Sequence, residues 1–170
     1  NPDRGLYRSV DGGATWERIL KGPNDNTGCV DVKLDPSNPN IIYAGMWNAY
    51  RTPYSLSSGG PGSGLFKSID GGKTWKEITK NPGMPKGMMG KCIVTISHID
   101  HNKLWASIEN KDNAGIYASN DGGDTWFLLT KENDLIQRPW YFSNIYVDPQ
   151  NDNELHILSV EYWRSINGGS

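Results

Sequence analysis

The sequence predicts an all-β fold of four-stranded antiparallel blades, arranged as a segment of a β-propeller. An eight-residue pattern, Ser-x-Asp-x-Gly-x-Thr-Trp, occurs three times, and a fourth copy begins at Ser165. The copies lie roughly 50 residues apart, which is the usual length of one propeller blade. Strand-like runs flank each copy, and the 20 glycines and 7 tryptophans suit tight turns between packed strands.

Each copy of the pattern predicts a β-hairpin between the third and fourth strands of a blade. Two strand signals are joined by Asp-Gly-Gly in the first three copies, and Gly supplies the positive φ that such a turn needs. The Asp carboxylate is expected to accept hydrogen bonds within the turn, and the Trp ring to pack against a neighbouring strand. We therefore assign a structural role to the repeated positions. They are Ser9, Asp11, Gly13, Thr15, Trp16, Ser68, Asp70, Gly72, Thr74, Trp75, Ser119, Asp121, Gly123, Thr125 and Trp126.

The pattern resembles the Asp-box (BNR) repeat. Five fixed positions match in each of three copies, and Asn167 replaces the Asp in the fourth. Asp-box repeats occur in β-propellers of sialidases, xyloglucan-cleaving glycoside hydrolases, sortilin-type receptors and a photosystem II assembly factor. The runs from Asp35 to Asn38 and from Arg138 to Tyr141 look similar to segments of bacterial sortilin-like, "glycosyl hydrolase-like" BNR-repeat proteins. The resemblance implies a secreted or periplasmic protein.

The whole chain, residues 1–170, is expected to be part of one propeller. Residues 1–21 would end one blade, 28–80 and 91–130 would each form a blade, and 140–170 would form an incomplete one. Blades pack only on their neighbours and leave open edges unless the ring closes. The expected partners are therefore the remaining blades of a longer chain, or a second copy of this one.

Composition excludes several classes of function. With 17 basic and 19 acidic residues the net charge is −2, which gives no electrostatic case for nucleic acid. No apolar run is long enough to span a bilayer. No cofactor is expected, and no metal site, because His98 and His101 fall in a predicted turn. Cys29 and Cys92 fall on successive blades, where either a disulfide or two buried thiols would fit.

Ligand binding is expected on the rim opposite the repeated turns. Strand direction alternates, so the turns occupy one rim and the more variable loops occupy the other, where propellers bind ligands. One long loop supplies Trp47, Tyr50, Arg51 and Tyr54, and a second supplies Arg138, Trp140 and Tyr141. These side chains would suit a stacking platform for a glycan or a peptide. Alternatively, the aromatic rings pack on their own blade and Arg138 stacks on Trp140.

Acid–base chemistry on a glycoside would need two carboxylates about 5–10 Å apart. Candidates on inner strands or on the ligand-side loops are Asp31, Glu109, Asp112, Asp134 and Glu161. Asp31 is the best catalytic candidate because it lies in the middle of an inner strand. A buried carboxylate there requires a partner, such as Lys33 or Arg138, so a structural ion pair is the competing interpretation.

The favoured function is a non-catalytic binding or scaffold module of a larger exported protein, with its ligand on the rim opposite the Asp boxes. The alternative is a glycoside hydrolase, sialidase- or xyloglucanase-like, whose catalytic carboxylates are shared with a missing part of the chain. The Arg-Ile-Pro signature of sialidases is absent. Whether the protein is an enzyme stays open at this level. An Asp31 held by Lys or Arg, without a second carboxylate nearby, would weaken the enzyme hypothesis.

Overall fold

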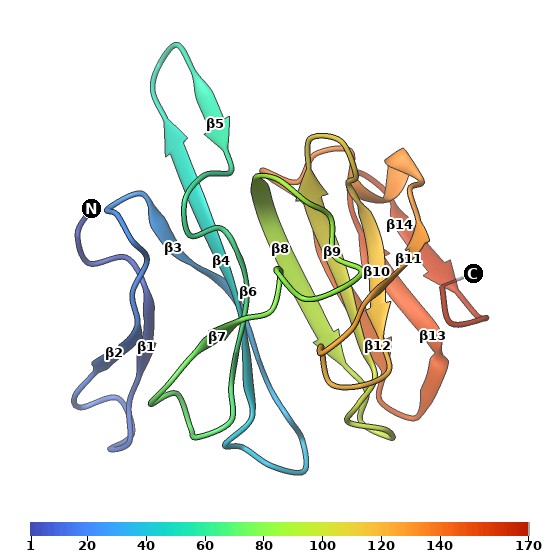
Figure 1. The fold of residues 1–170 in the computed structure, drawn as a ribbon, viewed down its shortest axis with the longest axis horizontal. Helices are drawn as coiled ribbons and strands as arrows, with labels where there is room; N and C mark the ends of the chain where they lie inside the picture. Colours follow the sequence, from blue (N-terminus) through green and yellow to red (C-terminus); the bar gives the residue numbers. More distant parts are fainter. Residues whose placement is uncertain (170) are drawn as a thin grey trace.

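The computed structural model describes residues 1–169, which form four antiparallel sheets standing side by side (Figure 1). The first sheet pairs β1 (Leu6–Arg8) with β2 (Glu17–Leu20). The second has the order β3 (Thr27–Leu34), β4 (Ile42–Arg51), β6 (Gly64–Ser68) and β7 (Lys76–Glu77), with β5 (Leu56–Ser58) added to the far end of β4. Successive strands in each sheet are neighbours, as expected for blades built from hairpins.

The third sheet has the order β8, β9, β10, β11, and the fourth has β12, β13, β14. Their bounds are β8 (Met89–Ile96), β9 (Leu104–Asn110), β10 (Gly115–Ser119), β11 (Phe127–Thr130), β12 (Asn144–Asp148), β13 (Asn151–Leu158) and β14 (Tyr162–Ser165). One 3-10 turn, η1 (Asn133–Ile136), lies between the third and fourth sheets in sequence. No helix among the described residues is long and apolar enough to cross a membrane.

The three complete copies of the repeat adopt the same hydrogen-bonded turn. In the second copy, Asp70 Oδ1 accepts from Ser68 Oγ at 2.8 Å and from Thr74 N at 2.9 Å, and its Oδ2 accepts from Thr74 Oγ1 at 2.6 Å. Gly71 and Gly72 have φ of 73° and 88°, in the left-handed region that favours glycine. In the fourth copy Asn167 Oδ1 accepts from Ser165 Oγ at 2.7 Å, so part of the pattern persists without the carboxylate.

Each later turn also bonds to the sheet that precedes it. Trp75 Nε1 donates to Ile19 O at 2.9 Å, Lys67 Nζ to Gly122 O at 2.7 Å, and Trp105 Nε1 to Gly168 O at 3.3 Å. The repeated Trp is therefore covered where a preceding sheet exists. Trp126 is 4% exposed, whereas Trp16, which has no preceding sheet among residues 1–169, is 63% exposed.

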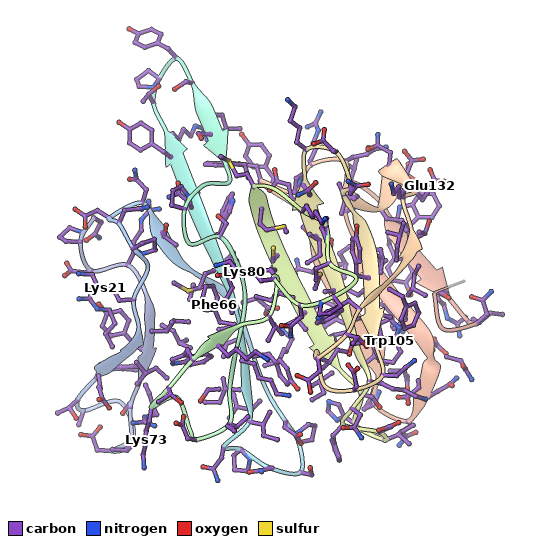
Figure 2. The ribbon with its side chains drawn as sticks, in the orientation of Figure 1. Lys21, Phe66, Lys73, Lys80, Trp105 and Glu132 are labelled. Carbon is purple, nitrogen blue, oxygen red and sulfur yellow. The ribbon has the colours of Figure 1, made fainter. Side chains whose placement is uncertain are left out.

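The core lies between neighbouring sheets. One cluster of buried side chains joins the second sheet to the third, and another joins the third sheet to the fourth. Every residue of β8 is buried. Figure 2 shows side chains filling the space between sheets, with Trp105 among them, whereas Lys73 lies at the rim of the repeated turns. Packing is closest at Gly45, where an added Cβ would lie 2.2 Å from Cys92 O.

Three local features differ from what the sequence pattern indicates. The segment after Trp47 is not only a loop, because β4 continues to Arg51 and pairs with β5 in a hairpin that projects from the second sheet (Figure 1). The aromatic and apolar run from Tyr141 to Val147 predicts a strand, but the strand begins at Asn144, since Tyr141 N and Phe142 N both donate to Arg138 O in a turn. The alternation of Val30, Val32 and Leu34 predicts that they share one side of β3, but Val32 and Leu34 are exposed, because the first sheet has only two strands to cover that side.

Candidate functional site

A cavity of about 660 Å³ opens on the rim opposite the repeated turns. Its wall combines the segment before β1, the start of β3, the far half of β4 and Trp140 from the loop before β12. Parts of the chain that are far apart in sequence therefore meet at one place. Four of the predicted ligand-binding residues line this cavity: Trp47, Tyr50, Arg51 and Trp140.

Two tryptophans, one from β4 and one from the loop before β12, form the centre of the site. The rings of Trp47 and Trp140 meet edge to face, with centroids 4.7 Å apart and planes inclined by 67°. Trp47 Nε1 donates to Ser58 Oγ at 2.9 Å, and Ser58 Oγ donates to Glu109 Oε2 at 2.6 Å. This chain of hydrogen bonds fixes the indole from β5 and β9, so the aromatic surface is preorganised. Trp47 thus packs against another sheet as well as lining the cavity.

Lys91, which the sequence does not predict as a site residue, lies beside Trp47 but is not part of the cavity wall. Its side chain rises from β8 and places Nζ 5.6 Å from the centroid of the Trp47 ring. The residue is 8% exposed, and Nζ makes no hydrogen bond or ion pair with residues 1–169. Burial lowers the pKa of Lys91, while the charges of Glu109 and Asp31 oppose that shift. A lysine as the one charged residue in the buried strand β8 is the sequence signal that would have identified it.

Arg4 is a second residue that sequence reasoning missed. Its Nη1 donates to Asn26 O at 2.7 Å and to Ala49 O at 2.9 Å, and these bonds join the start of the chain to β3 and β4. Both acceptors are neutral carbonyls, so neither of them is a counterion for the guanidinium at the cavity wall. Arg4 has no local motif that would mark it, because both of its partners lie more than twenty residues away.

Asp31 holds neighbouring strands together and does not line the cavity. Its Oδ1 pairs with Lys33 Nζ at 2.5 Å, and its Oδ2 accepts from Val94 N of β8 at 2.9 Å. Both carboxylate oxygens are therefore occupied, one by a cation and one by the next sheet. Lys33 is one of the two partners anticipated for this carboxylate.

The remaining predicted residues lie apart from the cavity. Tyr54 is 96% exposed at the tip of the β4–β5 hairpin, and Arg138 and Tyr141 are exposed beside Trp140 without lining the cavity wall. Among the other candidate carboxylates, only Glu109 contacts the aromatic centre, through Ser58. The last three do not line the cavity: Asp112, Asp134 and Glu161.

Neither cysteine forms a disulfide, and no cluster of metal-ligating side chains exists within residues 1–169. Cys29 Sγ contacts Asp31 O at 3.1 Å, and burial raises the pKa of that thiol to about 11. Burial also raises the pKa of Cys92. His101 Nδ1 lies 3.3 Å from Asp35 Oδ1, in the turns between the first and second strands of two sheets. The candidate site is the cavity lined by Trp47, Trp140 and the two arginines Arg4 and Arg51.

No family model matches the chain, but several curated proteins resemble it. The chain is 27% identical to xyloglucanase Xgh74A of Acetivibrio thermocellus over 202 residues, covering 98% of this chain and 22% of that protein. It is 28% identical to a sialidase of Bacteroides fragilis over 160 residues, covering 73% of this chain and 28% of the sialidase. The chain therefore spans less than a third of the length of these relatives.

Solved structures show the fold. The GH74 enzyme of Niastella koreensis superposes with a TM-score of 0.65 at 19% identity, covering 96% of this chain and 25% of that one. The structure of YCF48 bound to D1 peptide superposes with a TM-score of 0.56 at 14% identity, covering 88% of this chain and 41% of that one. Together with the four antiparallel sheets, these likenesses confirm the predicted fold: the chain is a set of β-propeller blades.

Proposed function

We propose that this chain is a non-catalytic, saccharide-binding part of a β-propeller, and that its ligand occupies the cavity on the rim opposite the repeated turns. The contact between Trp47 and Trp140 carries the proposal, because β4 and the loop before β12 contribute one aromatic surface to the cavity wall. Aromatic rings with a polar rim suit the apolar faces and hydroxyl edges of sugars. The relatives named as xyloglucanases and a sialidase favour a glycan over a peptide.

The repeated turns belong to the scaffold in this proposal. We infer that they are Asp boxes of the BNR type and that the sortilin-like resemblance reflects this shared architecture. Both oxygens of each carboxylate already accept hydrogen bonds inside the turn, as in Asp70. The exported location that the resemblance implies stays a prediction.

The glycoside hydrolase alternative has less support from the site. Asp31, the best catalytic candidate, is bound to Lys33 and to the backbone of β8, and it lies outside the cavity wall. A general acid or a nucleophile needs an oxygen free to reach the glycosidic bond. We therefore expect binding without hydrolysis from the residues of this chain.

Binding is tested by titrating the protein with xyloglucan oligosaccharides, lactose and sialyllactose, and following tryptophan fluorescence and heat. Replacing Trp47 or Trp140 with Ala should weaken binding roughly 10-fold, as expected when an aromatic contact worth about 1.4 kcal/mol is lost. Trp16→Ala is the matched control, because Trp16 lies on the rim of the repeated turns. Equal affinity in all three variants, or no saccharide bound at all, would refute the proposal. Release of reducing sugar that disappears in Asp31→Asn would instead establish the hydrolase.

A further inference from the structure

We propose, resting on the saccharide-binding function above, that the ligand carries a carboxylate, and that Lys91, Arg4 and Arg51 recognise it beside the Trp47–Trp140 pair. The inference begins with charge. The chain has a net charge of −2, yet cationic side chains gather at this cavity. Arg4 and Arg51 line its wall, Asp3 is the one acidic side chain in that wall, and Lys91 lies against Trp47.

Lys91 provides the strongest argument. Its ammonium has three donors, and none is paired with an acceptor among residues 1–169, but Nζ is not one of the fully buried unpaired polar atoms and so keeps some access to solvent. Partial burial removes much of the water around this cation, so an anion placed beside it would interact with it more strongly than in open solvent. Glu109 is close enough to influence it, but Glu109 Oε2 already accepts from Ser58 Oγ and from Lys91 N. A ligand carboxylate would supply the acceptor that Lys91 lacks.

The two arginines extend the same chemistry to the other side of the cavity. Arg4 uses Nη1 on two carbonyls, which leaves its other guanidinium N–H groups for a ligand. Arg51 is exposed at the end of β4 and has no carboxylate at ion-pair distance within residues 1–169. Arginine matches carboxylate geometry with paired N–H groups. A pyranose that stacks on the indoles and carries a carboxylate therefore satisfies both parts of the site.

The experiment compares acidic saccharides with neutral ones of matched size. The probes are trigalacturonate against galactotriose and 3′-sialyllactose against lactose, titrated into the protein at low and high salt. We expect the acidic member of at least one pair to bind roughly 10-fold more tightly at low salt, with this preference shrinking as salt screens the charges. The pair that shows the preference identifies the source of the carboxylate, a uronate or a sialic acid.

Variants separate the role of charge from folding. Lys91→Met removes the charge and leaves an unbranched apolar side chain of nearly the same length, and it should abolish most of the acidic preference. Urea unfolding of this variant checks that the fold is retained. Arg51→Gln, at an exposed position, should reduce the preference without any effect on folding. Lys73→Met, on the opposite rim, is the control and should change nothing. Loss of preference in the first two variants alone supports the inference.

Three other outcomes are decisive in different ways. Equal binding of acidic and neutral saccharides would overturn the carboxylate inference and leave the proposed function standing. Failure of every saccharide to bind would overturn both. An acidic preference that persists in Lys91→Met and Arg51→Gln would also overturn the inference, because the charge would then be recognised elsewhere.

Discussion

At the scale of single residues, the repeated Asp is a hydrogen-bond acceptor tuned by its turn. The side-chain hydroxyl of Thr15 lowers the pKa of Asp11 to about 2, and Thr74 does the same for Asp70, with backbone N–H and Ser hydroxyl donors assisting. In Asp121, burial raises the pKa, but hydrogen bonds from Thr125 and Ser119 outweigh it and lower the pKa. The charged form is thus favoured in the folded protein.

The first prediction concerns acid stability. Because the folded pKa is depressed to about 2 in Asp11 and Asp70, the stabilisation is complete above the unfolded value near 4 and is lost as the pH falls from about 4 to 2. Urea unfolding midpoints measured across this range should decline more steeply in the unchanged protein than in Asp70→Asn. The matched control is Asp124→Asn, whose carboxylate is exposed and 3.9 Å from Lys76 Nζ. Identical pH profiles for Asp70→Asn and the unchanged protein would contradict the explanation.

What the sequence reveals at this scale depends on where a residue's partners lie. The partners of Asp70 are within four residues, so residue types alone predict the turn. For Asp31, the need for a partner was predictable from its buried position, and Lys33 lies two residues away. Lys91 and Arg4 were missed because their neighbours come from other strands. Contacts between residues close in sequence can therefore be predicted from the sequence, whereas contacts between distant strands cannot.

At the scale of elements, the hairpin between the third and fourth strands stabilises one sheet through another. The backbone N–H of Trp126 donates to Pro82 O at 2.9 Å, and Asn81 Nδ2 donates to Gly123 O at 2.7 Å. The loop after the second sheet is therefore hydrogen-bonded to the turn of the third sheet. The strands themselves were largely predictable from apolar runs between glycine turns. The β4–β5 hairpin was not, because the Ser- and Gly-rich segment that forms β5 shows no apolar alternation.

The second prediction compares the same Trp in two copies of the repeat. Trp126→Ala should lower the free energy of unfolding by about 3–5 kcal/mol, as for other buried large side chains. Trp16→Ala should cost about 0.5 kcal/mol or less, because most of that ring is in water. Chemical denaturation of the two variants measures the difference. Similar losses in both would mean that the tryptophan acts within its own turn and not between sheets.

At the scale of the whole molecule, the backbones of the second and third sheets approach closely, with no room for a side chain between them at Gly45. Gly45 in β4 faces Cys92 O in β8, where an added Cβ would lie 2.2 Å from the oxygen. The Asp31 carboxylate spans the same boundary. The propeller fold could be predicted from the spacing of the repeats, but this closeness could not, because no local pattern distinguishes Gly45 from a strand glycine elsewhere.

The third prediction tests this boundary. Gly45→Ala should cost about 1–3 kcal/mol of stability, because backbone must move to admit the methyl group. It should also let a thiol reagent reach Cys92, which is buried in the native protein. Ser57→Ala in β5 is the control and should leave both stability and thiol labelling unchanged. Normal stability together with a protected Cys92 in Gly45→Ala would show that the sheets have room to separate.

The bonds from each turn back to the preceding sheet also bear on the order in which the sheets form during synthesis. Trp75 Nε1 donates to Ile19 O, Lys67 Nζ to Gly122 O, and Trp105 Nε1 to Gly168 O. In each pair, the partner outside the turn precedes the turn in sequence and is therefore synthesised first. Domains and repeats fold progressively as they are synthesised. A newly made hairpin would therefore bond to groups already synthesised, while its own apolar side chains are covered only when the next sheet forms. This arrangement predicts that neighbouring sheets dock in the order of their synthesis.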